Sequence, residues 1–114
     1  MTVRDITQKL SLFVCCGEGK LDHEVTGGYA GDLMSDVMAN SKAGNVWVTM
    51  QVHANIVAVA VLKELSGIII VNGRRPAEDT LKKAVEENVP ILISTMPAFE
   101  VTGRLYVLGI SNVT

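Results

Sequence analysis

The sequence contains few aromatic residues, few cysteines and no excess of positive charge. Aromatic residues make up 4% of its 114 residues, so few rings are available to stack on nucleic-acid bases. Ten Lys and Arg against twelve Asp and Glu give a net charge of −2, without the basic excess typical of nucleic-acid binding. We therefore expect no nucleic-acid partner. Hydrophobic residues, mostly aliphatic, make up 48%, and this surplus predicts a self-associating surface and a homodimer.

Long apolar runs are also absent. The most hydrophobic segment, residues 56–62, ends at Lys63 and Glu64 and is far shorter than the roughly 20 apolar residues of a membrane-spanning helix. The first residues lack the apolar stretch and the small-residue cleavage site of a secretory signal. We therefore expect a cytoplasmic protein with no membrane contact.

Two cysteines, Cys15 and Cys16, are adjacent in the chain. Adjacent cysteines do not suit a structural disulfide, and they cannot reproduce the spaced pair that chelates zinc or holds an iron–sulfur cluster. We therefore expect reduced thiols and no metal, with one side chain in the core and the other at the end of a strand. A reactive thiol, or a metal site that also uses His23 and His53, is the alternative.

The hydrophobic pattern alternates between strands and helices. Strands are predicted at residues 11–16, 46–51, 68–71 and 91–93, and helices at residues 2–10, 33–44, 55–65, 76–88 and 95–108. The glycine-rich segment 25–31 is predicted to be a turn or a bulged strand. Three successive strand–helix pairs with right-handed crossovers give a mostly parallel sheet. We predict a three-layer α/β fold with helices flanking the sheet, and a single domain spanning residues 1–114.

The predicted ends of two helices depend on single residues. Asp32 is predicted to be the N-cap of the helix that ends near Gly44, and an alternative is a divalent-cation site formed by Asp32 and Asp36. Gly67 is predicted to close the helix at 55–65. That helix has almost no polar face, so we expect it to be covered nearly all round, either centrally or at a dimer interface.

The candidate binding residues follow the predicted strands, because ligands of such sheets bind outside the carboxyl ends of the strands. They are Cys15, Cys16 and Gly17; Gln51, His53 and Asn55; Asn72, Gly73, Arg74 and Arg75; and Ser94 and Thr95. Arg74 and Arg75 stand near a helix start and predict a site for a small anion such as a phosphate. A solvated arginine pair after an Asn72-Gly73 turn is the alternative.

No complete catalytic motif is present. His53 lies where a strand meets a helix and could act as a base, but no nucleophile and Asp stand at motif spacing, and a helix-entry or packing role is the alternative. Gly19-Lys20 is followed by Leu21, where a phosphate-binding loop requires Ser or Thr.

The segment Thr26-Gly27-Gly28 and its surroundings resemble the signature of the DRTGG domain family. The resemblance continues through residues 29–38, 46–49, 56–62 and 68–73, so it covers most of the chain, although Glu24 and Val25 replace the family's Asp-Arg. Paired glycines permit close backbone approach, and the Thr26 hydroxyl can bond a ligand or a neighbouring backbone group.

The resemblance implies a regulatory or dimerising domain. Such domains are attached to phosphotransacetylases, cobyrinic-acid-synthase-like proteins and CBS-domain pyrophosphatases, and their fold is similar to that of the amino-terminal domain of HPr kinase/phosphorylase. Small stand-alone members are described as hydrogenase-related from gene context.

The residues and the resemblance together predict a non-catalytic regulatory or ligand-binding module that homodimerises. We expect no obligatory cofactor, and a small anionic ligand such as an adenine nucleotide at Thr26, Gly27, Gly28, Gln51, His53, Asn72, Gly73, Arg74, Arg75, Ser94 and Thr95. The alternatives are a small phosphoryl- or acyl-transfer enzyme using His53 with Arg74 or Arg75, and a hydrogenase-associated redox or metal accessory protein.

Overall fold

Five strands form one sheet in the computed structural model, which describes residues 1–113. They are β1 (Phe13–Cys16), β2 (Gly27–Ala30), β3 (Asn45–Thr49), β4 (Gly67–Ile70) and β5 (Ile91–Ile93). The strand order is β1-β5-β4-β3-β2, with β2 to β5 parallel and β1 antiparallel to β5. The predicted mostly parallel sheet is confirmed.

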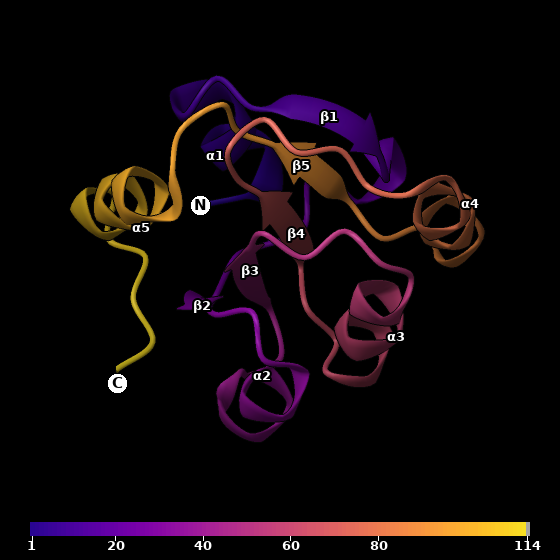
Figure 1. Cartoon of the computed structure of the whole chain (residues 1–114). Coiled ribbons are helices and arrows are strands. Elements are labelled where there is room, and N and C mark those ends of the chain that lie inside the picture. Colours follow the sequence, from indigo (N-terminus) through magenta and orange to yellow (C-terminus); the bar gives the residue numbers. More distant parts are fainter. Residues whose placement is uncertain (114) are drawn as a thin grey trace.

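Helices cover both faces of the sheet (Figure 1). They are α1 (Val3–Lys9), α2 (Met34–Asn40), α3 (Asn55–Leu62), α4 (Glu78–Glu87) and α5 (Ala98–Val107), with a short 3₁₀ turn, η1 (Glu18–Lys20). In Figure 1, α1 and α5 lie on one side of the column of strands, and α3 and α4 lie on the other. This arrangement confirms the predicted three-layer α/β fold.

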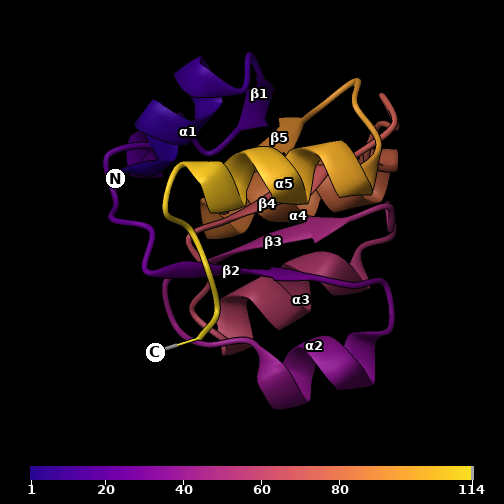
Figure 2. The same ribbon diagram turned by 90° about the vertical axis from the view of Figure 1, so that its left-hand side faces the viewer.

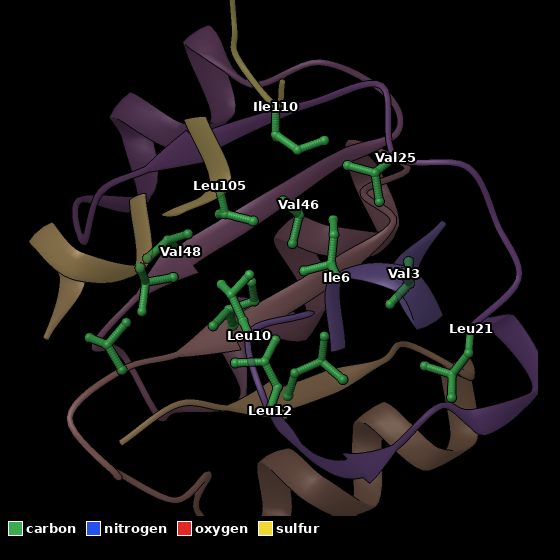
Figure 3. Close-up of a cluster of buried hydrophobic side chains, with 14 residues drawn as sticks. Val3, Ile6, Leu10, Leu12, Leu21, Val25, Val46, Val48, Leu105 and Ile110 are labelled. Carbon is green, nitrogen blue, oxygen red and sulfur yellow. The ribbon is translucent and has the colours of Figure 1, made fainter. Parts of the chain in front are cut away.

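The strands are aliphatic on both faces, so each face needs its own helical cover. Because side chains alternate along a strand, Val46 and Val48 of β3 face α1 and α5, whereas Trp47 faces the α3 side. The buried side chains thus form two clusters, one on each face of the sheet. Figure 3 shows the cluster on the α1 and α5 side, where residues of these helices meet the strands. The central strand β4 is buried along its whole length.

The helix after β2 does not begin as predicted. Its N-cap is Leu33, without a side-chain cap, and Asp32 lies one residue before it. The Asp32 carboxylate instead accepts hydrogen bonds from Thr49 and Met50 at the end of β3. The helix ends at Asn40, and Gly44 lies in the following turn with φ 81°.

The predictions for the next helix also need correction. Helix α3 ends at Leu62, the chain turns at Glu64 with φ 54°, and Gly67 is the first residue of β4 rather than a helix stop. The central position, one of the two alternatives, is wrong, since Val61 is 43% and Leu62 70% exposed within the chain, whereas cover at a dimer interface stays a prediction. The reason is its place as an outer layer, which buries only the side that faces the sheet.

The segment predicted as a turn or bulged strand contains a strand in regular parallel register with β3, from Gly27 opposite Asn45 to Ala30 opposite Val48. The irregularity lies in β1 instead, where the register with β5 shifts between Val14 and Cys16. Among the described residues, no helix is both long enough and apolar enough to cross a membrane.

The burial of β4 predicts the cost of truncating it. Ile69 is fully buried among α1-side residues, so Ile69→Ala should lower the free energy of unfolding by about 2–5 kcal/mol because it leaves a cavity. Chemical denaturation measures this change. The exposed Val85→Ala on α4 is the control and should change stability by less than about 0.5 kcal/mol. Equal effects of the two substitutions would contradict the assigned core.

Candidate functional site at the carboxyl edge of the sheet

The loops after β2 and β3 are joined by the Asp32 carboxylate. Asp32 Oδ1 accepts hydrogen bonds from the Thr49 hydroxyl and from the Met50 N–H, both at 2.8 Å. The Gln51 side chain donates to the Asp32 carbonyl at 3.0 Å. These bonds hold the start of the β3–α3 loop against the end of β2, on the right-hand side of the sheet in Figure 2.

Arg74 extends this network to the loop after β4. Its guanidinium donates to the Met50 carbonyl at 2.7 Å. The chain reaches Arg74 through Asn72 and Gly73, which have φ of 61° and 66° and turn the backbone sharply after the strand. The predicted Asn72-Gly73 turn is therefore present, and it places the Arg74 side chain against the neighbouring loop.

The loop after β5 is tied to the same turn. The Gly73 N–H donates to the Ser94 carbonyl at 2.7 Å, and the Asn72 N–H donates to the Met96 carbonyl at 2.9 Å. The buried Ser94 hydroxyl accepts from the Met96 N–H at 3.0 Å, so it serves the loop itself, whereas Thr95 is exposed.

Arg75 lies beside the first residue of β1. Because β1 runs antiparallel to β5, Phe13 pairs with Ile93 and stands at the carboxyl edge of the parallel strands. The Arg75 guanidinium lies 5.4 Å from the centre of the Phe13 ring, within the range of a cation–π contact. Within residues 1–113, no salt bridge includes Arg74 or Arg75, so neither charge is neutralised by a carboxylate contact.

The helix starts at this edge differ in their charge. No side chain caps α3, α4 or α5. The first turn of α4 carries Glu78 and Asp79 and that of α5 carries Glu100, whereas the first turn of α3 has no acidic residue. An anion at this edge is therefore best accommodated by the start of α3, whose preceding loop is held by Arg74.

His53 lies in the turn that leads into α3. Its side chain is exposed and, among the described residues, makes no hydrogen bond, while its carbonyl accepts from the Ile56 N–H at 3.2 Å. Within residues 1–113, no nucleophilic side chain is hydrogen-bonded to it. The structure thus gives the histidine a place at the helix entry, beside the candidate anion site, without a catalytic partner.

Cys16 and Gly17 do not lie at this edge, contrary to the prediction. The antiparallel direction of β1 places Cys16 opposite Ile91 and Gly17 against Pro90, where the parallel strands begin, while Cys15 lies at the register shift between Val14 and Cys16. Cys16 donates through its thiol to the Val89 carbonyl at 3.3 Å. Burial raises the pKa of both thiols above the ordinary cysteine value, which disfavours the reactive thiolate.

The Thr-Gly-Gly segment also lies at the opposite edge. The Thr26 hydroxyl donates to the Ala43 carbonyl at 2.8 Å, and a Cβ on Gly27 would lie 2.4 Å from the Ser111 carbonyl oxygen. Gly28 donates its N–H to that same carbonyl at 3.3 Å. The two glycines therefore let the C-terminal segment pack on β2, and they do not share a site with Arg74.

Asp32 is the residue of this edge whose role the sequence analysis missed. A helix cap was the simplest interpretation of an Asp before an amphipathic pattern. Recognising residues 27–30 as a strand would have placed Asp32 directly after a carboxyl end. The alternative, a divalent-cation site formed by Asp32 and Asp36, is not supported, because the Asp36 carboxylate accepts a hydrogen bond from the Tyr29 hydroxyl at 2.6 Å while Asp32 bonds Thr49 and Met50. Residues 1–113 also contain no group of three or more His, Cys, Asp or Glu able to hold a metal.

The fold is similar to that of a known regulatory region. No family model and no curated protein matches this sequence. A solved structure of the CBS and DRTGG domains of the regulatory region of Clostridium perfringens pyrophosphatase, in complex with the activator diadenosine tetraphosphate, matches with a TM-score of 0.68 and 15% identity. The match covers 91% of this chain but only 45% of that one. At this identity the similarity establishes a shared fold with part of that region.

The cysteine environment predicts slow thiol chemistry. Iodoacetamide alkylation followed across pH should give a kinetic pKa above the ordinary cysteine value for Cys15 in Cys16→Ser, and for Cys16 in Cys15→Ser, because burial disfavours both thiolates. Unfolded protein in denaturant is the control and should show the ordinary value. A kinetic pKa below the ordinary value in the folded protein would instead support a reactive thiol.

The Gly27 clearance predicts a specific loss of stability. Gly27→Ala should destabilise the protein by about 1–3 kcal/mol, because the new Cβ meets the Ser111 backbone. Gly31→Ala is the matched control, since its Cβ would have ordinary contacts starting at 3.5 Å. Thermal unfolding of both variants tests this, and an unchanged midpoint for Gly27→Ala would show that the close approach is not required.

Proposed function

We propose that this chain is a non-catalytic regulatory module of the DRTGG type, which binds a small anionic ligand, such as an adenine nucleotide, and forms a homodimer. The observation that carries the ligand proposal is the pair Arg74 and Arg75 at the carboxyl edge, both without a salt bridge in residues 1–113. A guanidinium has five N–H donors, and the bond to the Met50 carbonyl accounts for one of those on Arg74.

The geometry of the loops supports a pre-formed site. Bonds made by Asp32, Gln51, Gly73 and Arg74 connect the loops that follow β2, β3, β4 and β5, so little ordering would be needed on binding. His53 and the exposed Thr95 add donors near this edge. Of the predicted ligand residues, Thr26, Gly27 and Gly28 are not included in the proposed site, because they lie where β2 begins.

The similarity of fold supports the regulatory part of the proposal. The pyrophosphatase region, part of which shares this fold, is regulatory and was solved in complex with a nucleotide activator. The proposed ligand of the present chain is of the same chemical class, and the arginine pair supplies the charge that phosphates require. Exposed apolar residues on α3 and α5 support self-association.

Thermal-shift titration with AMP, ADP, ATP, diadenosine tetraphosphate and inorganic phosphate tests the ligand proposal. Wild type should be stabilised by at least one nucleotide, and the double variant Arg74→Ala/Arg75→Ala should lose that stabilisation because it removes both guanidinium groups. Binding to wild type should also weaken as salt is raised, since the contact is largely electrostatic.

The double variant Lys82→Ala/Lys83→Ala is the matched control. It also removes two positive charges, from exposed positions within α4, and should bind like wild type. Equal loss in both double variants would indicate general electrostatic attraction rather than a site, and no stabilisation of wild type by any ligand at millimolar concentration would refute the ligand proposal.

A further inference from the structure

The outer side of α5 carries the most exposed large apolar residues of the described chain. Phe99 is 86% and Val107 is 87% exposed. They are eight residues apart, with Gly103 midway, so all three lie along one side of the helix. Figure 2 shows α5 as an outer layer in front of the sheet, running along the direction of the strands. A largely apolar hollow of about 550 Å³ separates this side of α5 from Lys9 and Leu10 at the end of α1.

Nothing in residues 1–113 requires a glycine at position 103. A Cβ there would meet nothing within 4 Å, and its φ is not in the left-handed region. In the middle of a helix, glycine costs about 1 kcal/mol relative to alanine. Because Gly103 has no side chain, the helix surface between Phe99 and Val107 is flat, and the backbone of another helix can come close there.

The charged residues beside this apolar side of α5 can pair with the same residues of a second copy. Glu100 and Arg104 lie one turn apart next to Gly103, and within residues 1–113 neither forms a salt bridge. In a two-fold dimer the same surface meets itself, so every contact occurs twice. With two antiparallel α5 helices crossing at Gly103, Phe99 lies level with Val107 of the second copy. Measured along the helix axis, Glu100 of one copy is then within about 3 Å of the position of Arg104 in the second copy.

We infer that α5 is the homodimer interface, with the second copy packing its own α5 antiparallel across Gly103. This inference rests on the proposed self-association and names its surface. The alternative surface on α3 is less suited, because its exposed large apolar residues, Val61 and Leu62, are confined to the last turn and are followed by Lys63 and Glu64.

Charge reversal tests the arrangement. Wild type should be a dimer by sedimentation equilibrium, and Glu100→Arg and Arg104→Glu should each dimerise at least about tenfold more weakly, because each places like charges opposite one another. An equimolar mixture of the two variants should regain a dimer close to wild-type affinity, since its charges are again opposite. The rescue separates pairing across the interface from any effect of each substitution on the helix itself.

Leu62→Lys on α3 is the control and should leave the dimer intact. Circular dichroism and thermal unfolding confirm that each variant is folded. A monomeric wild type would overturn both the interface and the proposed self-association. A dimer that survives both charge reversals but is lost in Leu62→Lys would overturn the α5 interface and leave self-association standing. The nucleotide thermal shift, repeated on the charge variants, reports the ligand proposal separately.

Discussion

The burial of β3, β4 and β5 on both faces is the constraint on which the rest of this structure depends. Aliphatic side chains alternate between two separate clusters, one covered by α1 and α5 and the other by α2, α3 and α4. The parallel direction of β2 to β5 requires crossover connections between them, and it brings the four loops that follow these strands to one edge of the sheet. The candidate binding site is therefore a consequence of how the core is buried.

Hydrogen bonds then turn that set of loops into a defined surface. Asp32 joins β2 to β3, Arg74 joins the β4 loop to the β3 loop, and Gly73 joins it to the β5 loop. The result is a rim with two arginine charges that no salt bridge in the described residues neutralises. Helix α5, which covers one face of the sheet, offers an exposed apolar side, so the proposed ligand site and the proposed dimer interface involve different residues.

The Thr-Gly-Gly segment shows why a motif does not identify its own role. Its residues allow close backbone approach, as expected, but the group that approaches is the Ser111 carbonyl, and the Thr26 hydroxyl bonds the Ala43 carbonyl. Both partners belong to this chain. The glycines therefore let Ser111 pack on the edge strand β2, and Thr26 holds the turn before β3, at the edge opposite the arginine pair.

The sequence by itself determined the order of the elements, the α/β class and the position of Arg74 and Arg75 after a buried strand, because hydrophobic periodicity and turn residues act over a few neighbouring positions. Only the tertiary structure decided the direction of β1, the partners of Asp32 and the exposure of the outer side of α3. Each of these depends on residues far apart in the chain. Phe13 pairs with Ile93, and Asp32 bonds Thr49, and no local pattern encodes which distant strand a short segment joins or in which direction it runs.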